Sequence, residues 1–417
     1  MEFIADFHLH SKYSRATSSR MDLENLNKFA KIKGITLLGT GDFTHPRWFQ
    51  ELKEKLAPAE KGLFVLKNAP SETRFILTGE VSCIYFKFNR LRKIHLVLFS
   101  PSFEICEQIN RFLSFYGNLE ADGRPTLSLD AKELVKGVLK ISENCLIVPA
   151  HLMTPWFSLF GSRSGFDSLE ECFEEYSKYI FAGETGLSAS PAMLWRMPDG
   201  RRITLISNSD SHSPEKIGRE ANVFNTDLNY FSILEAIKKK DKEKFLFTIE
   251  FFPEEGKYHF DGHRSCGISL HPKETKKYHG ICPVCGKALT IGVLNRVEQL
   301  ADRPEGFLPQ NAIPFKSLVP LDEILAEVFQ TETSNLKVAQ IYQKLVETFG
   351  SEFNVLLKAE ISEIEKVSSP KIAEAIKRVR EGKVFKIPGY DGVYGKIKIF
   401  EEPQTPNNSV KEQRTLF

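Results

Sequence analysis

Short apolar stretches alternate with amphipathic segments over the first 255 residues of the chain. The stretches with the length and continuous apolar character of buried strands are Phe3–Phe7, Ile35–Gly39, Phe75–Thr78, Ile94–Phe99, Leu146–Pro149, Ile180–Ala182 and Ile203–Ser207. Apolar positions at helical spacing predict helices over Leu23–Lys33, Ile105–Tyr116, Ala131–Ile141, Ser168–Tyr176 and Tyr230–Lys239. This alternation of buried strands and helices favours a parallel sheet, and about seven such units fit a (β/α) barrel better than an open sheet. The predicted fold class is therefore α/β.

The pattern changes after residue 255. Residues 256–293 are rich in Gly, His, Lys and Cys and predict a small zinc-binding module. Residues 294–400 predict a helical domain, with helices over Leu321–Phe329, Leu336–Phe349 and Lys371–Arg380 and a closing hairpin within Val384–Phe400. Residues 401–417 are polar and contain prolines, and we expect a flexible tail there.

Composition and charge exclude some classes of protein. At 417 residues, two or three domains are expected, and 41% hydrophobic with 26% charged residues is ordinary for a globular chain. No apolar run reaches the roughly 20 residues of a membrane span, and we expect no secretory signal at the start. A net charge of +2 is too small to indicate a nucleic-acid partner by itself. The odd count of seven cysteines favours a reducing, cytoplasmic compartment.

Histidines and carboxylates gather where the predicted strands end. The first pair, His8 and His10, are two residues apart, so both side chains face the same side of an extended chain, and Asp210 and His212 repeat this spacing. The full set of candidate ligands is His8, His10, Asp42, His45, Glu80, His95, His151, Asp210 and His212. In a parallel barrel the carboxyl ends of the strands meet at one face, so these groups can converge. Imidazole with carboxylate suits Zn²⁺, Mn²⁺ or Fe²⁺ better than Ca²⁺.

Any one of these histidines could be an ordinary core or loop residue, but the whole set indicates a metal cluster. It contains more ligands than one ion uses, and a carboxylate such as Glu80 can bridge two ions. Polynuclear sites of this kind hold a phosphate and lower the pKa of a bound water. We therefore predict two to three divalent ions (Zn, Mn or Mg) and hydrolysis of a phosphate ester, with His8, His10, Glu80, Asp210 and His212 as the catalytic residues.

The segment Asp6-Phe-His8-Leu-His10-Ser resembles the opening motif of the PHP (polymerase and histidinol phosphatase) superfamily, and Ser209-Asp210-Ser-His212 resembles its closing motif. The resemblance implies a distorted seven-stranded barrel with three ions. It implies one ion on His8, His10, Glu80 and Asp210, and a second on Glu80, His95 and His151.

Two positions depart from the superfamily pattern. Phe43 stands where the second motif has a histidine, and His45 follows two residues later. The additional ligand after the first motif would fall near Arg15 and Ala16, which cannot serve. A third ion would therefore rely on His212 with Asp42, His45 or both.

A second set of ligands lies in residues 256–293. His263 and Cys266 form one pair and Cys282 and Cys285 another, each with a two-residue gap, which is typical of a closed tetrahedral zinc site. His259, His271 and His279 are alternatives for the fourth ligand, but only His263 repeats the gap. Such a site would organise a loop rather than perform catalysis.

The C-terminal half indicates a large substrate. The basic helix from Lys371 to Arg380 resembles the second half of a helix–hairpin–helix, which grips DNA phosphates, although such a run is more often a solvated face. The order of barrel, zinc module, helical domain and the closing segment Pro388–Gly395 resembles the endonuclease Q family of archaea and some bacteria. The resemblance implies a prokaryotic, nucleoid-associated nuclease of DNA repair.

That resemblance implies cleavage of double-stranded DNA on the 5′ side of hypoxanthine, uracil, xanthine or an abasic site, leaving a 3′-hydroxyl and a 5′-phosphate. Extrusion of the lesion needs a pocket, for which Trp156 and Glu184 are candidate walls. Gln413, Leu416 and Phe417 resemble the beginning of a box that binds the DNA sliding clamp, with an uneventful tail as the alternative.

Two other classes of function remain open from the sequence. A PHP barrel alone would suit a phosphatase acting on a small phosphomonoester, but the zinc module and the helical domain count against it. A non-catalytic, zinc-organised DNA-binding protein would not need the complete ligand set of the barrel.

Overall fold

The computed structural model describes residues 1–69 and 72–400. Its largest element is a mixed sheet in which β1 (Glu2–Asp6), β2 (Leu37–Gly39) and β5 (Arg74–Lys87) run parallel to one another. Its other strands are β3 (Leu56–Pro58), β4 (Phe64–Leu66), β6 (Arg90–Ser100), β7 (Thr126–Leu127), β8 (Leu146–Pro149), β11 (Ala221–Asn225), β12 (Phe245–Glu250) and β15 (Phe315–Ser317). A separate parallel pair is formed by β9 (Ala182–Glu184) and β10 (Thr204–Ile206).

The α/β class is confirmed, but the expectation of parallel strands throughout is wrong. Strand β6 runs antiparallel to both β5 and β8, and β11 runs antiparallel to β1 and β12. The connection between β5 and β6 is only Phe88-Asn89, with φ of 54° and 56°. A two-residue turn of this kind joins antiparallel strands, whereas a parallel crossover needs about a dozen residues or more.

The strands nevertheless surround a common apolar interior. One cluster of buried side chains draws on β1, β2, β5, β6, β8, β9, β10 and β11 and includes Phe3, Phe7, Leu37, Ile76, Phe99, Val148, Ala182, Ile206 and Phe224. Phe7 lies just beyond the end of β1, and the first metal-binding motif follows it directly. The apolar interior therefore stops where the polar cluster begins.

Helices cover this sheet, and local capping explains several of their bounds. The helices α1 (Leu23–Lys33), α4 (Ala131–Ile141) and α8 (Tyr230–Lys239) have the predicted bounds, and each begins after an Asp or Asn whose side chain accepts a backbone N–H. The remaining helices of this part are α2 (Pro46–Lys55), α3 (Phe103–Leu113), α5 (Leu169–Phe173), α6 (Pro191–Leu194) and α7 (Pro198–Arg202). Three-residue 3₁₀ turns lie at Pro214–Lys216, Pro253–Glu255 and Arg264–Cys266.

Several helices differ from the prediction: α3 spans Phe103–Leu113 instead of Ile105–Tyr116, and α6 and α7 were not predicted. The predicted helix Ser168–Tyr176 is interrupted at Glu174, whose φ is 50°, and continues as a 3₁₀ helix over Glu174–Tyr179. Helix α2 was not predicted, although Pro46 stands at its first turn. Its N-cap is His45, a residue that the spacing argument had assigned to the metal cluster.

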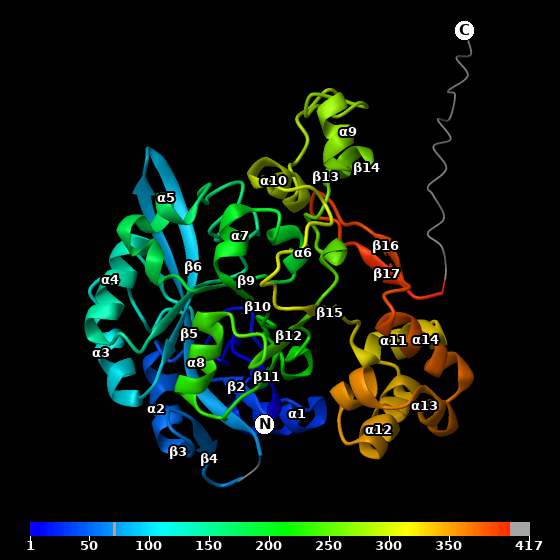
Figure 1. Cartoon of the computed structure of the whole chain (residues 1–417), viewed down its shortest axis with the longest axis horizontal. Helices are drawn as coiled ribbons and strands as arrows, with labels where there is room; N and C mark the ends of the chain where they lie inside the picture. The colour runs from blue at the N-terminus through cyan, green and yellow to red at the C-terminus, as the bar shows by residue number, and fades with distance from the viewer. Residues whose placement is uncertain (70–71, 401–417) are drawn as a thin grey trace.

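The zinc-ligand segment forms a small unit beside the sheet (Figure 1). It contains β13 (Asp261–His263), β14 (Ile268–Leu270), α9 (Pro272–Lys277) and α10 (Val293–Leu300). After α10 the chain returns to the main sheet, because β15 pairs with β12. The helical part therefore begins at α11, later than the predicted boundary at residue 294.

The helical part consists of α11 (Leu321–Phe329), α12 (Leu336–Phe349), a π-helical turn (Asn354–Lys358), α13 (Ile361–Val367) and α14 (Pro370–Arg380). The predicted hairpin is confirmed as β16 (Phe385–Ile387) and β17 (Lys396–Lys398). Its inner turn is Asp391-Gly392, with φ of 42° and 86°, between the bridged residues Tyr390 and Val393. The hairpin lies between the zinc-ligand unit and the helices (Figure 1). No helix among the described residues is long and apolar enough to span a membrane.

A buried ion pair joins α1 to the helical part. The Lys33 Nζ lies 2.6 Å from Glu352 Oε2, with side chains 9% and 4% exposed. The Glu352 carboxylate also accepts hydrogen bonds from the Tyr342 hydroxyl and the Leu321 N–H. Burial alone would raise the pKa of Glu352, but the ammonium group of Lys33 lowers it below its usual value. The pair therefore stabilises the folded chain at pH values above the pKa that Glu352 has in the unfolded chain. This stabilisation is lost as the pH falls through the lower pKa that Glu352 has in the folded chain.

We expect Glu352→Ala to lower the free energy of unfolding at pH 7 by about 3 kcal/mol, because it leaves the Lys33 ammonium buried without a partner. Urea denaturation should show the deficit shrinking as pH falls below about 4.5. The control is Lys358→Ala, which removes a solvent-exposed pair with Glu2 and should change stability by less than about 1 kcal/mol. Equal effects of the two variants would contradict this prediction.

Candidate metal centre

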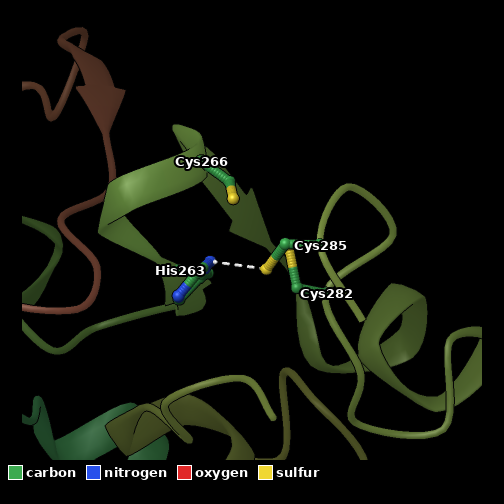
Figure 2. Close-up of side chains that lie close together, drawn as sticks. All are labelled: His263, Cys266, Cys282 and Cys285. Atoms are coloured by element: carbon green, nitrogen blue, oxygen red, sulfur yellow. Dashed lines mark hydrogen bonds between the residues drawn. The ribbon is translucent and has the colours of Figure 1, made fainter. Parts of the chain in front are cut away.

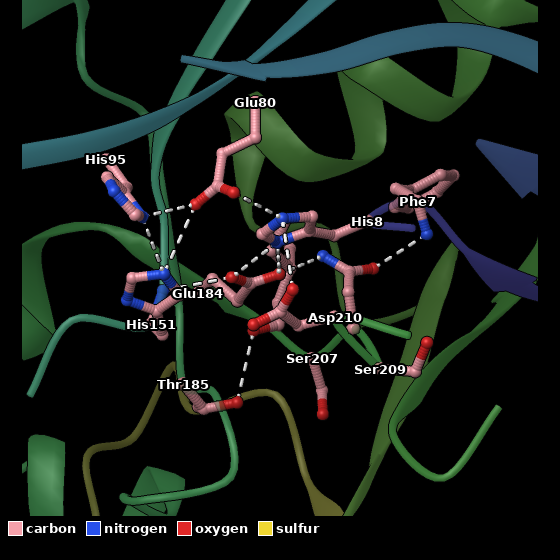
Figure 3. Close-up of polar contacts among 12 residues, drawn as sticks. Phe7, His8, Glu80, His95, His151, Glu184, Thr185, Ser207, Ser209 and Asp210 are labelled. Carbon is pink, nitrogen blue, oxygen red and sulfur yellow. Dashed lines mark hydrogen bonds and ion pairs between the residues drawn. The ribbon is translucent and has the colours of Figure 1, made fainter. Parts of the chain in front are cut away.

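The two sequence motifs that open and close the first domain lie side by side. Leu9 and Ser211 form an isolated parallel bridge, and the N–H of His10 donates to the Ser211 carbonyl over 3.0 Å. Because side chains alternate along extended backbone, the residues flanking Leu9 and those flanking Ser211 face the same cavity. One backbone bridge thus brings His8 and His10 next to Asp210, two hundred residues away. Figure 3 shows His8 beside Asp210.

The first group of ligand atoms is complete. His8, His10, Glu80 and Asp210 each place one nitrogen or oxygen atom within 4.8 Å of the others. The His10 Nε2 lies 3.1 Å from Asp210 Oδ1 and 3.3 Å from Glu80 Oε2. The His8 Nε2 lies 3.4 Å from the same Glu80 oxygen. The structure therefore brings together the four residues expected for one ion.

The second group depends on the antiparallel pairing of β5 and β6. Glu80 pairs with Val97, so His95, two residues away, projects to the same side of the sheet as Glu80. Glu80 Oε1 lies 2.8 Å from His95 Nδ1 and 3.2 Å from His151 Nε2. The two oxygens of this one carboxylate therefore face different groups of imidazoles. This is the geometry of a bridging ligand.

Buried acceptors set the orientation of the ligand imidazoles. Glu184 accepts from His8 Nδ1 over 3.0 Å, and Asp42 accepts from His10 Nδ1 over 3.1 Å. A carboxylate can only accept, so both Nδ1 atoms carry the proton and both Nε2 atoms are free to bind an ion. His8 Nε2 is buried and has no hydrogen-bond partner among the described residues. The donor set and this orphaned nitrogen fit a divalent cation.

The electrostatic state of the site matches this use. Burial alone would lower the pKa of His8, but Glu184, Glu80 and Asp210 raise it well above its usual value. Burial lowers the pKa of His95 to about 4, which leaves that imidazole neutral. Burial would raise the pKa of Glu80, yet His95 and Arg124 hold it well below its usual range. The Glu80 carboxylate is thus ionised, and ion binding at His8 would release a proton.

Arg124 was not predicted as a site residue. Its Nη1 lies 3.0 Å from Glu80 Oε2, and Glu80 raises the pKa of the guanidinium further, against the opposite effect of burial. Its charge also acts on Asp210 and His212. Arg124 belongs to a loop without periodicity or a recognisable motif, so no signal in the sequence could have indicated it.

Three predicted site residues have other roles in the structure. Asp42 points at the Nδ1 side of His10, and its second oxygen accepts from Ser11 and Ser14, so it orients a ligand instead of joining either group. The His45 Nδ1 caps α2 by accepting from the Trp48 N–H, and its ring stacks on Tyr13. The spacing argument missed this because a helix begins at Pro46.

Glu184 is the third such residue. It is fully buried, and its oxygens accept from His8, Asn208 and the His151 N–H, so it has no surface to offer to an extruded base. Trp156, by contrast, is 42% exposed and meets Tyr258 edge-on at 5.9 Å. The ring of the neighbouring Phe157 contacts the His95 ring, and the Phe157 carbonyl accepts from the backbone N–H of His95. Trp156 therefore lies on a loop that touches the ligand set.

The four predicted zinc ligands also converge (Figure 2). His263, Cys266, Cys282 and Cys285 place their ligand atoms within 4.8 Å of one another, and Cys285 Sγ lies 3.4 Å from His263 Nδ1. The Cys282 carbonyl accepts from the N–H of Gly286, whose φ is 73°. The alternative ligands lie elsewhere, since His271 caps α9 and neither His259 nor His279 joins the group.

Comparison with known proteins agrees with this architecture. The family model described as MJ0043 C-terminal domain matches residues 320–383. MJ0043, an uncharacterised protein of Methanocaldococcus jannaschii, is 34% identical over 252 residues, which are 58% of this chain and 31% of that protein. The chain thus spans about a third of the length of that relative. The uncharacterised protein YqxK of Bacillus subtilis is 29% identical over 94% of this chain and 98% of its own length.

Two solved structures resemble the whole chain. The lesion-specific endonuclease PfuEndoQ from Pyrococcus furiosus superposes with a TM-score of 0.86 at 32% identity, covering 96% of each chain. An endonuclease Q complex with a 27-mer duplex carrying an abasic lesion at the active site gives a TM-score of 0.84 at 32% identity, covering 96% of this chain and 97% of that one.

The α/β fold, the two ligand groups around one carboxylate and these likenesses define a metal-dependent phosphodiester hydrolase. At this identity over nearly its whole length, the chain belongs to the endonuclease Q family and is a metal-dependent DNA endonuclease.

The role of Glu184 behind His8 can be tested directly. We expect Glu184→Gln to weaken divalent-ion binding by about 10- to 100-fold, because the amide cannot fix the His8 tautomer as a carboxylate does. Competition with a chromogenic chelator measures this. Glu235→Gln, which changes only a surface pair with Lys239, is the control and should bind ions as wild type does. Unchanged ion affinity in Glu184→Gln would contradict the assigned role.

Proposed function

We propose that this chain hydrolyses the phosphodiester on the 5′ side of a deaminated base (hypoxanthine, uracil or xanthine) or an abasic site in double-stranded DNA. The observation that carries the proposal is Glu80, whose two oxygens face separate groups of imidazoles. Two ligand groups that share a bridging carboxylate suit an in-line displacement at phosphorus. The abasic duplex at the active site of a structure 32% identical to this chain supports the choice of substrate.

In this reaction a water oxygen bonds to phosphorus, the bond from phosphorus to the 3′-oxygen breaks, and that oxygen takes up a proton. The products carry a 3′-hydroxyl and a 5′-phosphate. Divalent ions held by His8, His10, Glu80 and Asp210 and by Glu80, His95 and His151 would polarise the phosphate and lower the pKa of a bound water. Glu184 and Asp42 keep the imidazoles oriented while this occurs. His212, whose ring packs against His10 and is partly exposed, lies where it can contact the phosphate.

The lesion is proposed to leave the duplex and rest against Trp156. An exposed indole can stack on a base or fill the gap left in the duplex. Tyr258, from the entry to the zinc-ligand unit, meets this indole, so the unit stands next to the loop that touches His95. The zinc-ligand unit would then shape one wall of the lesion pocket.

The C-terminal parts are proposed to hold the duplex. On α14 only part of the basic run is available for phosphates, since Arg380 donates to the carbonyls of Val355, Leu356 and Ala359. Lys377 remains on the exposed side of that helix, whereas Lys371, although exposed, donates from Nζ to the Val328 carbonyl. The proposed sliding-clamp box of Gln413, Leu416 and Phe417 and the expected flexible tail lie outside the described residues.

A nicking assay tests the function. Wild-type protein with Mg²⁺, Mn²⁺ or Zn²⁺ should cut a labelled duplex on the 5′ side of a single deoxyinosine, deoxyuridine or abasic site and leave an undamaged duplex intact. Asp210→Ala removes a ligand of the first group and should lower the rate by at least about 100-fold. The control is Asp227→Ala, at an exposed position outside both ligand groups. Turnover of a chromogenic phosphomonoester without nicking would favour a phosphatase and overturn the proposal.

We also propose one structural Zn²⁺ on His263, Cys266, Cys282 and Cys285. Cys282→Ser should lower the zinc content by one ion per chain and increase hydrogen exchange over residues 261–290, because the ligand pairs hold this unit closed. Elemental analysis and exchange mass spectrometry measure the two effects. The control Cys106→Ala alters a buried cysteine of the main core and should leave the zinc content unchanged. An unchanged zinc content in Cys282→Ser would exclude the site.

A further inference from the structure

The surroundings of the ligand groups do not fit a third ion. The resemblance to the PHP superfamily implies one, held by His212 with Asp42, His45 or both. Both oxygens of Asp42 are occupied by His10, Ser11 and Ser14, and the Nδ1 of His45 is occupied by the start of α2. His45 is also buried, so of these three residues His212 is the one with a partly exposed side chain, and one side chain does not hold a divalent ion. Among the described residues, no group of three or more ligands includes His212.

A guanidinium lies beside the first ligand group. The Arg124 Nη1 lies 3.0 Å from Glu80 Oε2, the same oxygen that faces His8 and His10. Its charge also interacts with Asp210 and His212. The Arg124 side chain is 28% exposed, so it pairs with Glu80 without being sealed off from solvent.

Hydrogen bonds hold the loop that carries Arg124 both before and after this residue. Asp122 Oδ1 accepts from the N–H of Arg124 and from the N–H of Arg15, at 3.2 Å each. On the other side, the Pro125 carbonyl accepts from the N–H of Ser82, where β7 begins to pair with β5. Arg124 therefore lies directly before β7, the strand that pairs with β5, and β5 carries Glu80.

Gly123 allows this loop to press against the metal centre. Its N–H donates to the Tyr13 carbonyl, and its carbonyl accepts from Thr44 Oγ1. A Cβ at this position would lie 2.2 Å from Asp42 Oδ2 and 2.2 Å from Ser14 Oγ. Only glycine fits there. The packing of Gly123 against Ser14 and Asp42 therefore fixes the position of the next residue, Arg124, relative to the ligand groups.

We propose that Arg124 replaces the third ion as a permanent positive charge that binds an oxygen of the scissile phosphate. This inference rests on the proposed function and adds a catalytic residue to it. An arginine suits the task because its charge does not depend on ion supply and its planar fork can donate two parallel hydrogen bonds to a phosphate. As water bonds to phosphorus and the bond to the 3′-oxygen breaks, negative charge builds up on the oxygens that this fork contacts.

Kinetic measurements on the full chain test this role. Arg124→Gln should lower kcat for an abasic duplex by about 100- to 1,000-fold, the usual cost of losing one preorganised donor to a transition state, with a much smaller change in KM. The kcat of Arg124→Lys should lie between those of the wild type and Arg124→Gln, because lysine keeps the charge but not the planar fork. The control is Arg202→Gln, an arginine that pairs with Glu170 and Asp199 away from the cluster. Nicking by Arg124→Gln at the wild-type rate would overturn the inference.

A sulfur-substituted substrate tests the contact itself. With a single phosphorothioate at the cleavage position, the wild type should discriminate between the two diastereomers, and Arg124→Gln should change their rate ratio while Arg202→Gln does not. An unchanged ratio in Arg124→Gln would mean that Arg124 acts through Glu80 and does not contact the phosphate, which also overturns the inference.

Ion content provides a readout that does not depend on activity. After dialysis against Mn²⁺, the wild type without DNA should hold two ions in the barrel beside the proposed zinc, and Arg124→Gln should hold the same number. Three barrel ions in the wild type, or loss of an ion in Arg124→Gln, would each overturn the inference. If wild-type protein fails to nick any lesion, the proposed function itself fails. Nicking that is indifferent to Arg124 removes only the inference.

Discussion

The centre of this protein depends on one buried carboxylate, that of Glu80. Its side chain has no exposed surface. A buried, ionised carboxylate is unfavourable unless cationic or hydrogen-bond donor groups surround it. Here four imidazoles and a guanidinium lie within 3.4 Å of its two oxygens. These partners come from four different segments of the chain, since His8 and His10 share one motif. The folding of the first domain is therefore linked to the assembly of the site.

The backbone provides this assembly through a few specific contacts. The bridge between Leu9 and Ser211 aligns the first and last motifs, and the antiparallel register of β5 and β6 puts His95 on the same side as Glu80. Behind the ligands, Glu184 and Asp42 fix which imidazole nitrogen is free. A site prepared in this way needs little rearrangement when ions and a phosphate enter, which is the condition for electrostatic catalysis.

Strand pairing, a backbone hydrogen bond and an ion pair connect the later parts of the chain to the first domain. Strand β15 extends the main sheet after the zinc-ligand unit, and the Gly389 N–H donates to the Glu254 carbonyl, which ties the hairpin to the end of the first domain. The Lys33–Glu352 pair anchors the helical part in the same way. These contacts hold the surfaces proposed to bind the duplex in a defined position relative to the ligand groups.

The sequence by itself determined the features that depend on neighbouring residues. These are the bounds of α1, α4 and α8, which follow from apolar periodicity and an N-cap, the two pairs His263–Cys266 and Cys282–Cys285, which could hold a metal ion, and the hairpin turn at Asp391-Gly392. It also indicated the ligands of the two groups, because a spacing of two in extended chain places side chains on one face.

Only the tertiary structure decided the direction of β6, the orienting role of Asp42 and Glu184, the capping role of His45 and the approach of Arg124. The physical reason is the same in each case. These features are contacts between residues separated by tens to hundreds of positions, or a choice between two uses of one side chain. Spacing along the chain carries no information about such contacts until the strands have paired.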